Sequence, residues 1–214
     1  MNKFLKPSLP LALLFGVSSL SAQTPKIKFE KYTLPNGLKV ILHQDNSAPV
    51  VAVSALYHVG SKNEDTAHTG FAHFFEHLMF EGSDNVKRGE FDKYTSNAGG
   101  YNNANTTQDR TYYFELLPSN QFKLGLWLES ERMLHAKIED VGVNTQKEVV
   151  KEERRQRLDN QPYGTIISEI FKRAFTVTPY HWDVIGSMQH LSSAKLSDFT
   201  DFYHTFSFPF RVRA

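Results

Sequence analysis

The stretch that most constrains this chain is "GFAHFFEHLMFEG", which runs from Gly70 to Gly82. Its apolar residues recur at positions i, i+3, i+4 and i+7, namely Phe71, Phe74, Phe75 and Leu78. This spacing predicts a helix with one apolar side. Thr69 precedes it as a candidate N-cap, and Gly82 lies past its end.

The same helix carries a polar stripe of three residues, His73, Glu76 and His77. Residues four apart lie about 6 Å apart along a helix, so both imidazoles can reach one ion. Burying them without partners costs several kcal/mol, which a bound cation would offset. The order H-x-x-E-H is typical of the inverzincin class of zinc peptidases. Ordinary hydrogen-bonded core histidines and a chance pattern are the competing interpretations.

A catalytic zinc site needs three protein ligands and one open position, so a third ligand must come from elsewhere. The chain has no cysteine, which leaves His, Asp or Glu. A helix predicted over about 144–158 offers three carboxylates: Glu148, Glu152 and Glu153. Glu153 shares the side of Val149 and Val150, whereas the other two point toward solvent. Helical position alone does not decide whether Glu153 is a metal ligand or lies on a solvated face of the helix.

Strands come first in the chain and helices afterwards, which predicts an α+β fold with a mixed, largely antiparallel sheet covered by helices. "PNG" at 35–37 predicts a hairpin between strands 29–34 and 38–43. Further strands are expected at 50–60, 101–107 and 110–117. Further helices are expected near 89–97 and at about 119–135, 163–175 and 194–205.

The 24 basic and 23 acidic residues give a net charge of +1, which argues against a nucleic-acid partner. Residues 1–22 combine Lys3 and Lys6, a short apolar run and small residues, as in a secretory signal peptide. We therefore predict export to the periplasm or outside the cell, without a stable membrane span after the signal is removed. An uncleaved N-terminal anchor is the alternative. Residues 23–214 are predicted to form one domain.

Five segments carry a family resemblance: "YTLPNGLKVIL", "VGSKNED", "GFAHFFEHLMFEGS", "NNANTTQDRTYYF" and "EVVKEERRQRLDNQPYG". With them the chain resembles the pitrilysin-like (insulinase, M16) zinc metallopeptidases over most of residues 28–205. The resemblance implies one Zn²⁺ per chain, held by His73, His77 and Glu153, which lies 76 residues beyond His77. It also implies that Glu76 is the general base of peptide hydrolysis.

In the family, an Asn-Ala pair on an edge strand adds the extended substrate by β-augmentation. The matching residues are Asn103 and Ala104, although an ordinary hairpin strand would look similar. Gln146 stands where the family often carries an acidic residue, so a charge behind the metal ligands is expected to be absent.

Family members carry a second, structurally similar half in the same chain or in a partner, so residues 23–214 are expected to need a companion. Two hypotheses follow. The chain is a zinc endopeptidase or oligopeptidase that acts on unfolded peptides, or it is an incompetent, peptide-binding fragment that keeps the metal.

Overall fold

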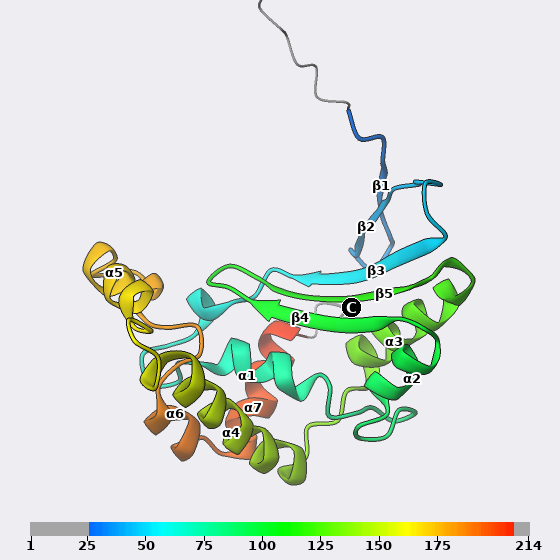
Figure 1. The fold of residues 1–214 in the computed structure, drawn as a ribbon. Coiled ribbons are helices and arrows are strands. Elements are labelled where there is room, and N and C mark those ends of the chain that lie inside the picture. Colours follow the sequence, from blue (N-terminus) through cyan, green and yellow to red (C-terminus); the bar gives the residue numbers. More distant parts are fainter. Residues whose placement is uncertain (1–25, 208–214) are drawn as a thin grey trace, which may run out of the picture.

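The computed structural model describes residues 26–207, which form a sheet above a layer of helices (Figure 1). The strands are β1 (Glu30–Thr33), β2 (Lys39–Leu42), β3 (Val50–Tyr57), β4 (Tyr101–Thr106) and β5 (Thr111–Pro118). The helices are α1 (Phe71–Leu78), α2 (Phe91–Asn97), α3 (Phe122–His135), α4 (Asp140–Arg154), α5 (Ile166–Ala174), α6 (Met188–Ser193) and α7 (Leu196–Phe202). The predicted α+β class is confirmed.

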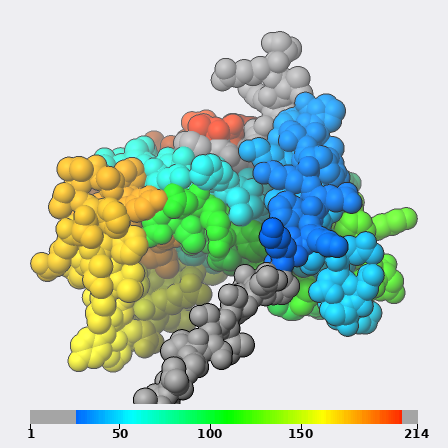
Figure 2. Space-filling model, turned by 90° about the horizontal axis from the view of Figure 1, so that it is seen from above, coloured from blue at the N-terminus to red at the C-terminus, as the bar shows by residue number. Residues whose placement is uncertain are grey.

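Three strands form the main sheet in the order β3-β5-β4, and both of its pairings are antiparallel. Along β5, buried and half-buried residues alternate, as expected for a central strand packed on one face. The predicted β1–β2 hairpin forms a second sheet, with Gly37 at φ 90° in its turn. Seen from above, this hairpin and the α5 segment lie at opposite ends of the molecule (Figure 2).

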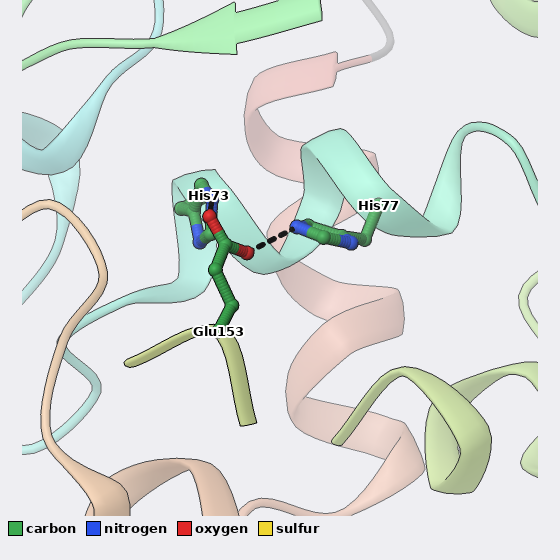
Figure 3. Close-up of side chains that lie close together, drawn as sticks. All are labelled: His73, His77 and Glu153. Carbon is green, nitrogen blue, oxygen red and sulfur yellow. Dashed lines mark ion pairs between the residues drawn. The ribbon is translucent and has the colours of Figure 1, made fainter. Parts of the chain in front are cut away.

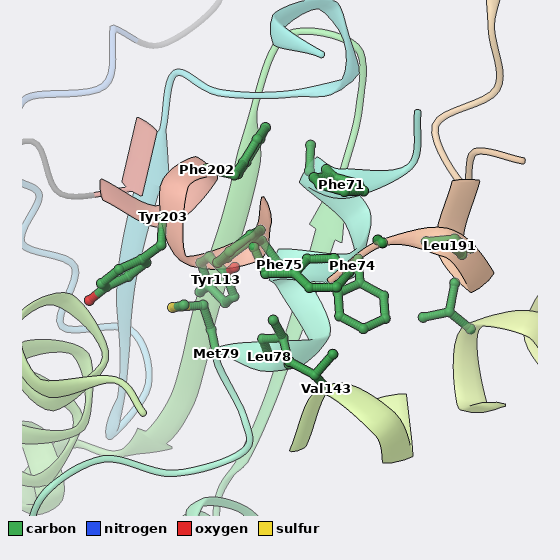
Figure 4. Packing of buried hydrophobic residues seen from close by; sticks show 14 residues of the cluster. Phe71, Phe74, Phe75, Leu78, Met79, Tyr113, Val143, Leu191, Phe202 and Tyr203 are labelled. Atoms are coloured by element: carbon green, nitrogen blue, oxygen red, sulfur yellow. The ribbon is translucent and has the colours of Figure 1, made fainter. Parts of the chain in front are cut away.

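Helix α1 lies between the main sheet and helices α4 and α7, and its apolar side forms the centre of the core (Figure 4). The ring of Phe199 on α7 stacks on Phe74 and Phe71, with ring centroids 4.4 and 4.7 Å away. Phe75 stacks on Phe202 at 5.0 Å. The helical spacing read from the sequence therefore identifies the face that the fold buries.

The N-terminus of α1 is held by the buried carboxyl group of Glu64. Glu64 accepts hydrogen bonds from the backbone N–H groups of Gly70 and Ala72 at 2.9 and 2.8 Å, and from the indole of Trp182 at 3.1 Å. The prediction of Thr69 as N-cap is wrong, because Gly70 takes the cap position with φ 93° and makes no side-chain cap bond. The Thr69 hydroxyl instead lies 2.8 Å from Nδ1 of His190.

The C-terminal end of α1 is held by a buried cation. Arg132 on α3 donates to the carbonyl oxygen of Met79 at 3.4 Å and pairs with Glu129. Burial, and then the neighbouring Glu129 carboxylate, raises the pKa of Glu115 to about 9, so that carboxyl is neutral at pH 7. Burial raises the pKa of Glu64 to about 8, so at the first turn this group acts as a hydrogen-bond acceptor. The Arg132 cation at the last turn favours the helix dipole. The helix with the polar stripe is thus fixed at both ends.

Glu64→Ala is expected to lower the free energy of unfolding by roughly 2–4 kcal/mol, because the backbone N–H groups of Gly70 and Ala72 lose their acceptor, while the Trp182 indole keeps the carbonyl oxygen of Ser61. Urea unfolding of the two proteins measures the difference. Glu64→Gln keeps one acceptor oxygen, so its free energy of unfolding should fall clearly less than that of Glu64→Ala. Equal stability of Glu64→Ala and the parent would contradict this role.

Several predicted boundaries need correction. Helix α4 begins at Asp140, four residues before the predicted start, and it continues after Arg154 as a π-helical turn, Arg155–Asp159. Val150 is fully buried as expected, but Val149 is 44% exposed, so its predicted inward position is wrong. Helix α6 was not predicted. None of the helices within residues 26–207 has the length and apolar character needed to cross a membrane. The predicted signal segment 1–22 lies outside the described residues.

Candidate metal centre

Three predicted ligand residues from two helices meet below the sheet (Figure 3). His73 and His77 project from α1, and Glu153 projects from the last turn of α4. Nε2 of His77 lies 3.1 Å from Oε2 of Glu153, and Nε2 of His73 lies 3.6 Å from Oε1. Each residue offers a ligand atom within 4.8 Å of the other two. Among residues 26–207, these are the three that form a group able to hold a metal ion.

This spacing suits a tetrahedral zinc ion. With zinc–nitrogen and zinc–oxygen bonds of about 2.0–2.2 Å, tetrahedral ligand atoms lie roughly 3.3–3.5 Å apart. The separations of 3.1 and 3.6 Å, which go to the two different oxygens of Glu153, lie near that value, and one ligand atom from each residue lies within 4.8 Å of the other two. His73 is also buried, and its Nδ1 has no hydrogen-bond partner within the described part of the chain. A cation on its Nε2 would offset the cost of burying this ring.

Among the three candidate carboxylates, the structure brings only Glu153 to the histidines. The side chains of Glu148 and Glu152 are 72% and 52% exposed, whereas that of Glu153 is 15% exposed. Burial raises the pKa of Glu153, but the hydrogen bonds and charges of His73 and His77 outweigh it and hold that pKa well below the usual range. The carboxylate is therefore ionised at neutral pH, as a metal ligand must be.

Glu76 points from the same helix toward the sheet. Its Oε2 accepts a hydrogen bond of 2.5 Å from Oγ1 of Thr106 on β4. Sequence reasoning missed this partner. Alternation along the strand was the available signal, since Ala104 and Thr106 both lie on the face of β4 turned toward the core.

Strand β4, which carries Asn103 and Ala104, is an edge strand of the described three-stranded sheet. These residues pair with Phe114 and Tyr113 on β5, so the other edge of β4 has no strand beside it within residues 26–207. Ala104 packs against the core, while Asn103 is exposed and accepts a hydrogen bond from the Ala104 backbone N–H at 2.8 Å. Helix α1 contacts β4 directly, so the edge lies near the polar stripe.

Comparison with known proteins identifies the family. Residues 39–186 match the family described as Insulinase (Peptidase family M16), and this match covers more than half of the chain. The chain therefore belongs to the M16 peptidase family. This family includes zinc proteases, and the predicted resemblance is confirmed.

Two relatives show how much of a longer protein the chain matches. It is 37% identical over 193 residues to the zinc protease PqqE of Helicobacter pylori, a match that covers 90% of this chain and 44% of that protein. It is 26% identical to a probable mitochondrial-processing peptidase subunit beta of Arabidopsis thaliana, over 95% of this chain and 38% of that one. The chain thus spans less than half the length of these relatives.

Solved structures agree on the fold. The crystal structure of a protease from Helicobacter pylori superposes with a TM-score of 0.81 at 37% identity, over 86% of this chain and 44% of that chain. The structure of pitrilysin gives a TM-score of 0.73 at 19% identity, over 87% of this chain and 20% of that chain, which shows a shared fold.

Proposed function

We propose that this chain is the zinc-bearing part of a peptidase that hydrolyses peptide bonds in extended or unfolded peptides. The observation that carries the proposal is the meeting of His73 and His77 on α1 with Glu153 on α4. Helix α1 also carries Glu76 and lies against the edge strand β4. Membership of a family that includes zinc proteases supports it. The competing proposal is a peptide-binding fragment that keeps the metal and does not turn over.

In this proposal, two neutral imidazoles and one carboxylate hold Zn²⁺ and leave a position open. When bound, zinc supplies Lewis-acid activation of water and of the scissile carbonyl group. Glu76 accepts a proton from the attacking water at its carboxylate and passes it to the leaving amine. The Thr106 hydroxyl holds Oε2 of Glu76, so Oε1 remains available for that proton.

The free edge of β4 is proposed to bind the substrate. A peptide added there would pair with the main chain around Asn103 and Ala104, as in other cases of β-augmentation. Because main-chain pairing needs an extended partner, it favours unfolded peptides over folded proteins. Ala104 has a small side chain and Asn103 is exposed, and the Asn103 amide would have to release the Ala104 N–H before a peptide could pair with it.

The partner and the location of the chain are also proposals. Relatives that are more than twice as long suggest that a second M16-like half, in the same chain or in another subunit, completes the peptidase. Periplasmic or secreted location rests on the signal-like sequence of residues 1–22.

Removal of the metal tests the proposed function. We expect the protein to cleave an unfolded peptide, to lose this activity in a strong chelator, and to regain it when about one equivalent of Zn²⁺ is returned. Mass spectrometry of the digest, with and without a co-expressed companion subunit, measures the outcome. Zinc binding without cleavage in either case would favour the binding fragment, and cleavage unaffected by the chelator would contradict the proposal.

A further inference from the structure

Hydrogen bonds connect the second ring nitrogen of His77 to the side-chain amide of Gln146, and that amide to the carboxylate of Glu81. Nδ1 of His77 lies 3.1 Å from Oε1 of Gln146 on α4. Nε2 of Gln146 in turn donates a hydrogen bond to Oε1 of Glu81, just beyond the end of α1. Position 146 carries no acidic residue, as expected, but the amide of Gln146 connects His77 to the carboxylate of Glu81.

The carboxylate decides which way the amide points. Glu81 can only accept when ionised, so Gln146 must turn its NH₂ group toward Glu81 and its carbonyl oxygen toward His77. That oxygen can only accept, so the His77 proton must sit on Nδ1. In the neutral form of His77 that a metal ion would need, this places the lone pair on Nε2, the nitrogen that faces Glu153.

Glu81 is itself held by an ion pair with Arg88. Its other oxygen accepts from Nε of Arg88, and its side chain is only 8% exposed. Helix α4 leaves space for it at Gly142, where an added Cβ would lie 3.2 Å from both Cγ and Oε2 of Glu81. The Glu81 side chain, just beyond the end of α1, is thus packed against Gly142 and bonded to Gln146, both on α4.

We infer that Glu81 is a positioning residue for zinc binding, which fixes the tautomer of His77 through the amide of Gln146. The inference rests on the proposed metal centre. Partners behind a metal ligand orient its ring and raise its basicity, and their loss typically costs 10–100-fold in metal affinity.

Glu81→Gln tests the relay. Arg88 can only donate, so the new amide keeps its oxygen toward Arg88 and turns its NH₂ group toward Gln146. Gln146 must then flip and present its own NH₂ group to His77, which moves the ring proton onto Nε2. We expect the Zn²⁺ affinity, measured by competition with a chromogenic chelator, to fall by about tenfold or more. The Co²⁺ absorption spectrum should change as well.

A charge swap provides the rescue. In Glu81→Gln/Gln146→Glu, the amide at position 81 donates to the new carboxylate at 146, which accepts the His77 proton directly and restores the tautomer. Its Zn²⁺ affinity should return to within about threefold of the parent protein. Glu148→Gln, on the exposed side of α4, removes an equal charge and should leave the affinity unchanged.

An affinity of Glu81→Gln equal to that of the parent, or a double variant that binds no tighter than the single one, would overturn the relay and leave the metal centre standing. If the parent itself binds no zinc, both proposals fail. If thermal melting shows that Glu81→Gln does not fold, the double variant decides: near-parental affinity supports the relay, and weaker binding contradicts it.

Discussion

Glu76→Gln is expected to reduce peptide cleavage by at least about 10²-fold, since a positioned general base contributes roughly 10²–10⁴ to the rate. The amide has nearly the same shape and can still accept the Thr106 hydrogen bond, but it cannot take a proton from water. Glu76 is not one of the three clustered ligand residues, so bound zinc should stay near one per chain. Cleavage of an unfolded peptide and elemental analysis measure the two effects separately.

Glu148→Gln is the matched control for this variant, because it makes the same chemical change on an exposed helix face. It should cleave at the parental rate. If Glu76→Gln retains full activity, another group removes the proton and the proposed role of Glu76 is wrong. If the parent and Glu76→Gln are equally inert even with a companion subunit, the binding-fragment hypothesis is favoured.

His73→Ala is expected to release zinc, with a loss of affinity of at least about 10²-fold. Removing a metal ligand lowers the affinity more than removing a residue that only hydrogen-bonds to a ligand. The remaining imidazole and carboxylate cannot complete a three-ligand site. Activity should disappear with the metal. Chelator competition and elemental analysis of the purified variant measure the loss.

His68→Ala is the control for this second variant. His68 lies five residues earlier, is 44% exposed and pairs with Asp65, so its removal should leave zinc binding intact. Parental zinc affinity in His73→Ala would show that His73 is not a ligand. Equal losses in both histidine variants would point to a general effect on folding rather than to the proposed centre.

Local patterns predicted the parts of the site that lie on one helix. The 3.6-residue period around Phe74 and Leu78 placed His73, Glu76 and His77 on their own stripe, and the structure keeps that separation. The β1–β2 hairpin also follows from a short-range turn signal. Such features depend on residues only a few positions apart, so a sequence can show them without a fold.

Contacts between distant segments could not be predicted in this way. The N-cap at Thr69 failed because Glu64 accepts from the N–H groups at the start of α1, while the Thr69 hydroxyl contacts His190, 121 positions away. The inward position predicted for Val149 is wrong for a related reason. Helical position shows which residues share a face, but the width of the face that neighbouring elements bury depends on the tertiary structure.

The sequence by itself determined the H-x-x-E-H stripe, its helix and the α+β class, because periodicity and residue chemistry are properties of neighbouring positions. Helix position alone left Glu153 undecided among three carboxylates, and the family resemblance selected it. Only the tertiary structure turned it toward the histidines, put Thr106 on Glu76 and linked Gln146 to Glu81. The physical reason is that these pairs lie 30 to 80 positions apart in the sequence, and the packing of α4 and β4 against α1 sets their geometry.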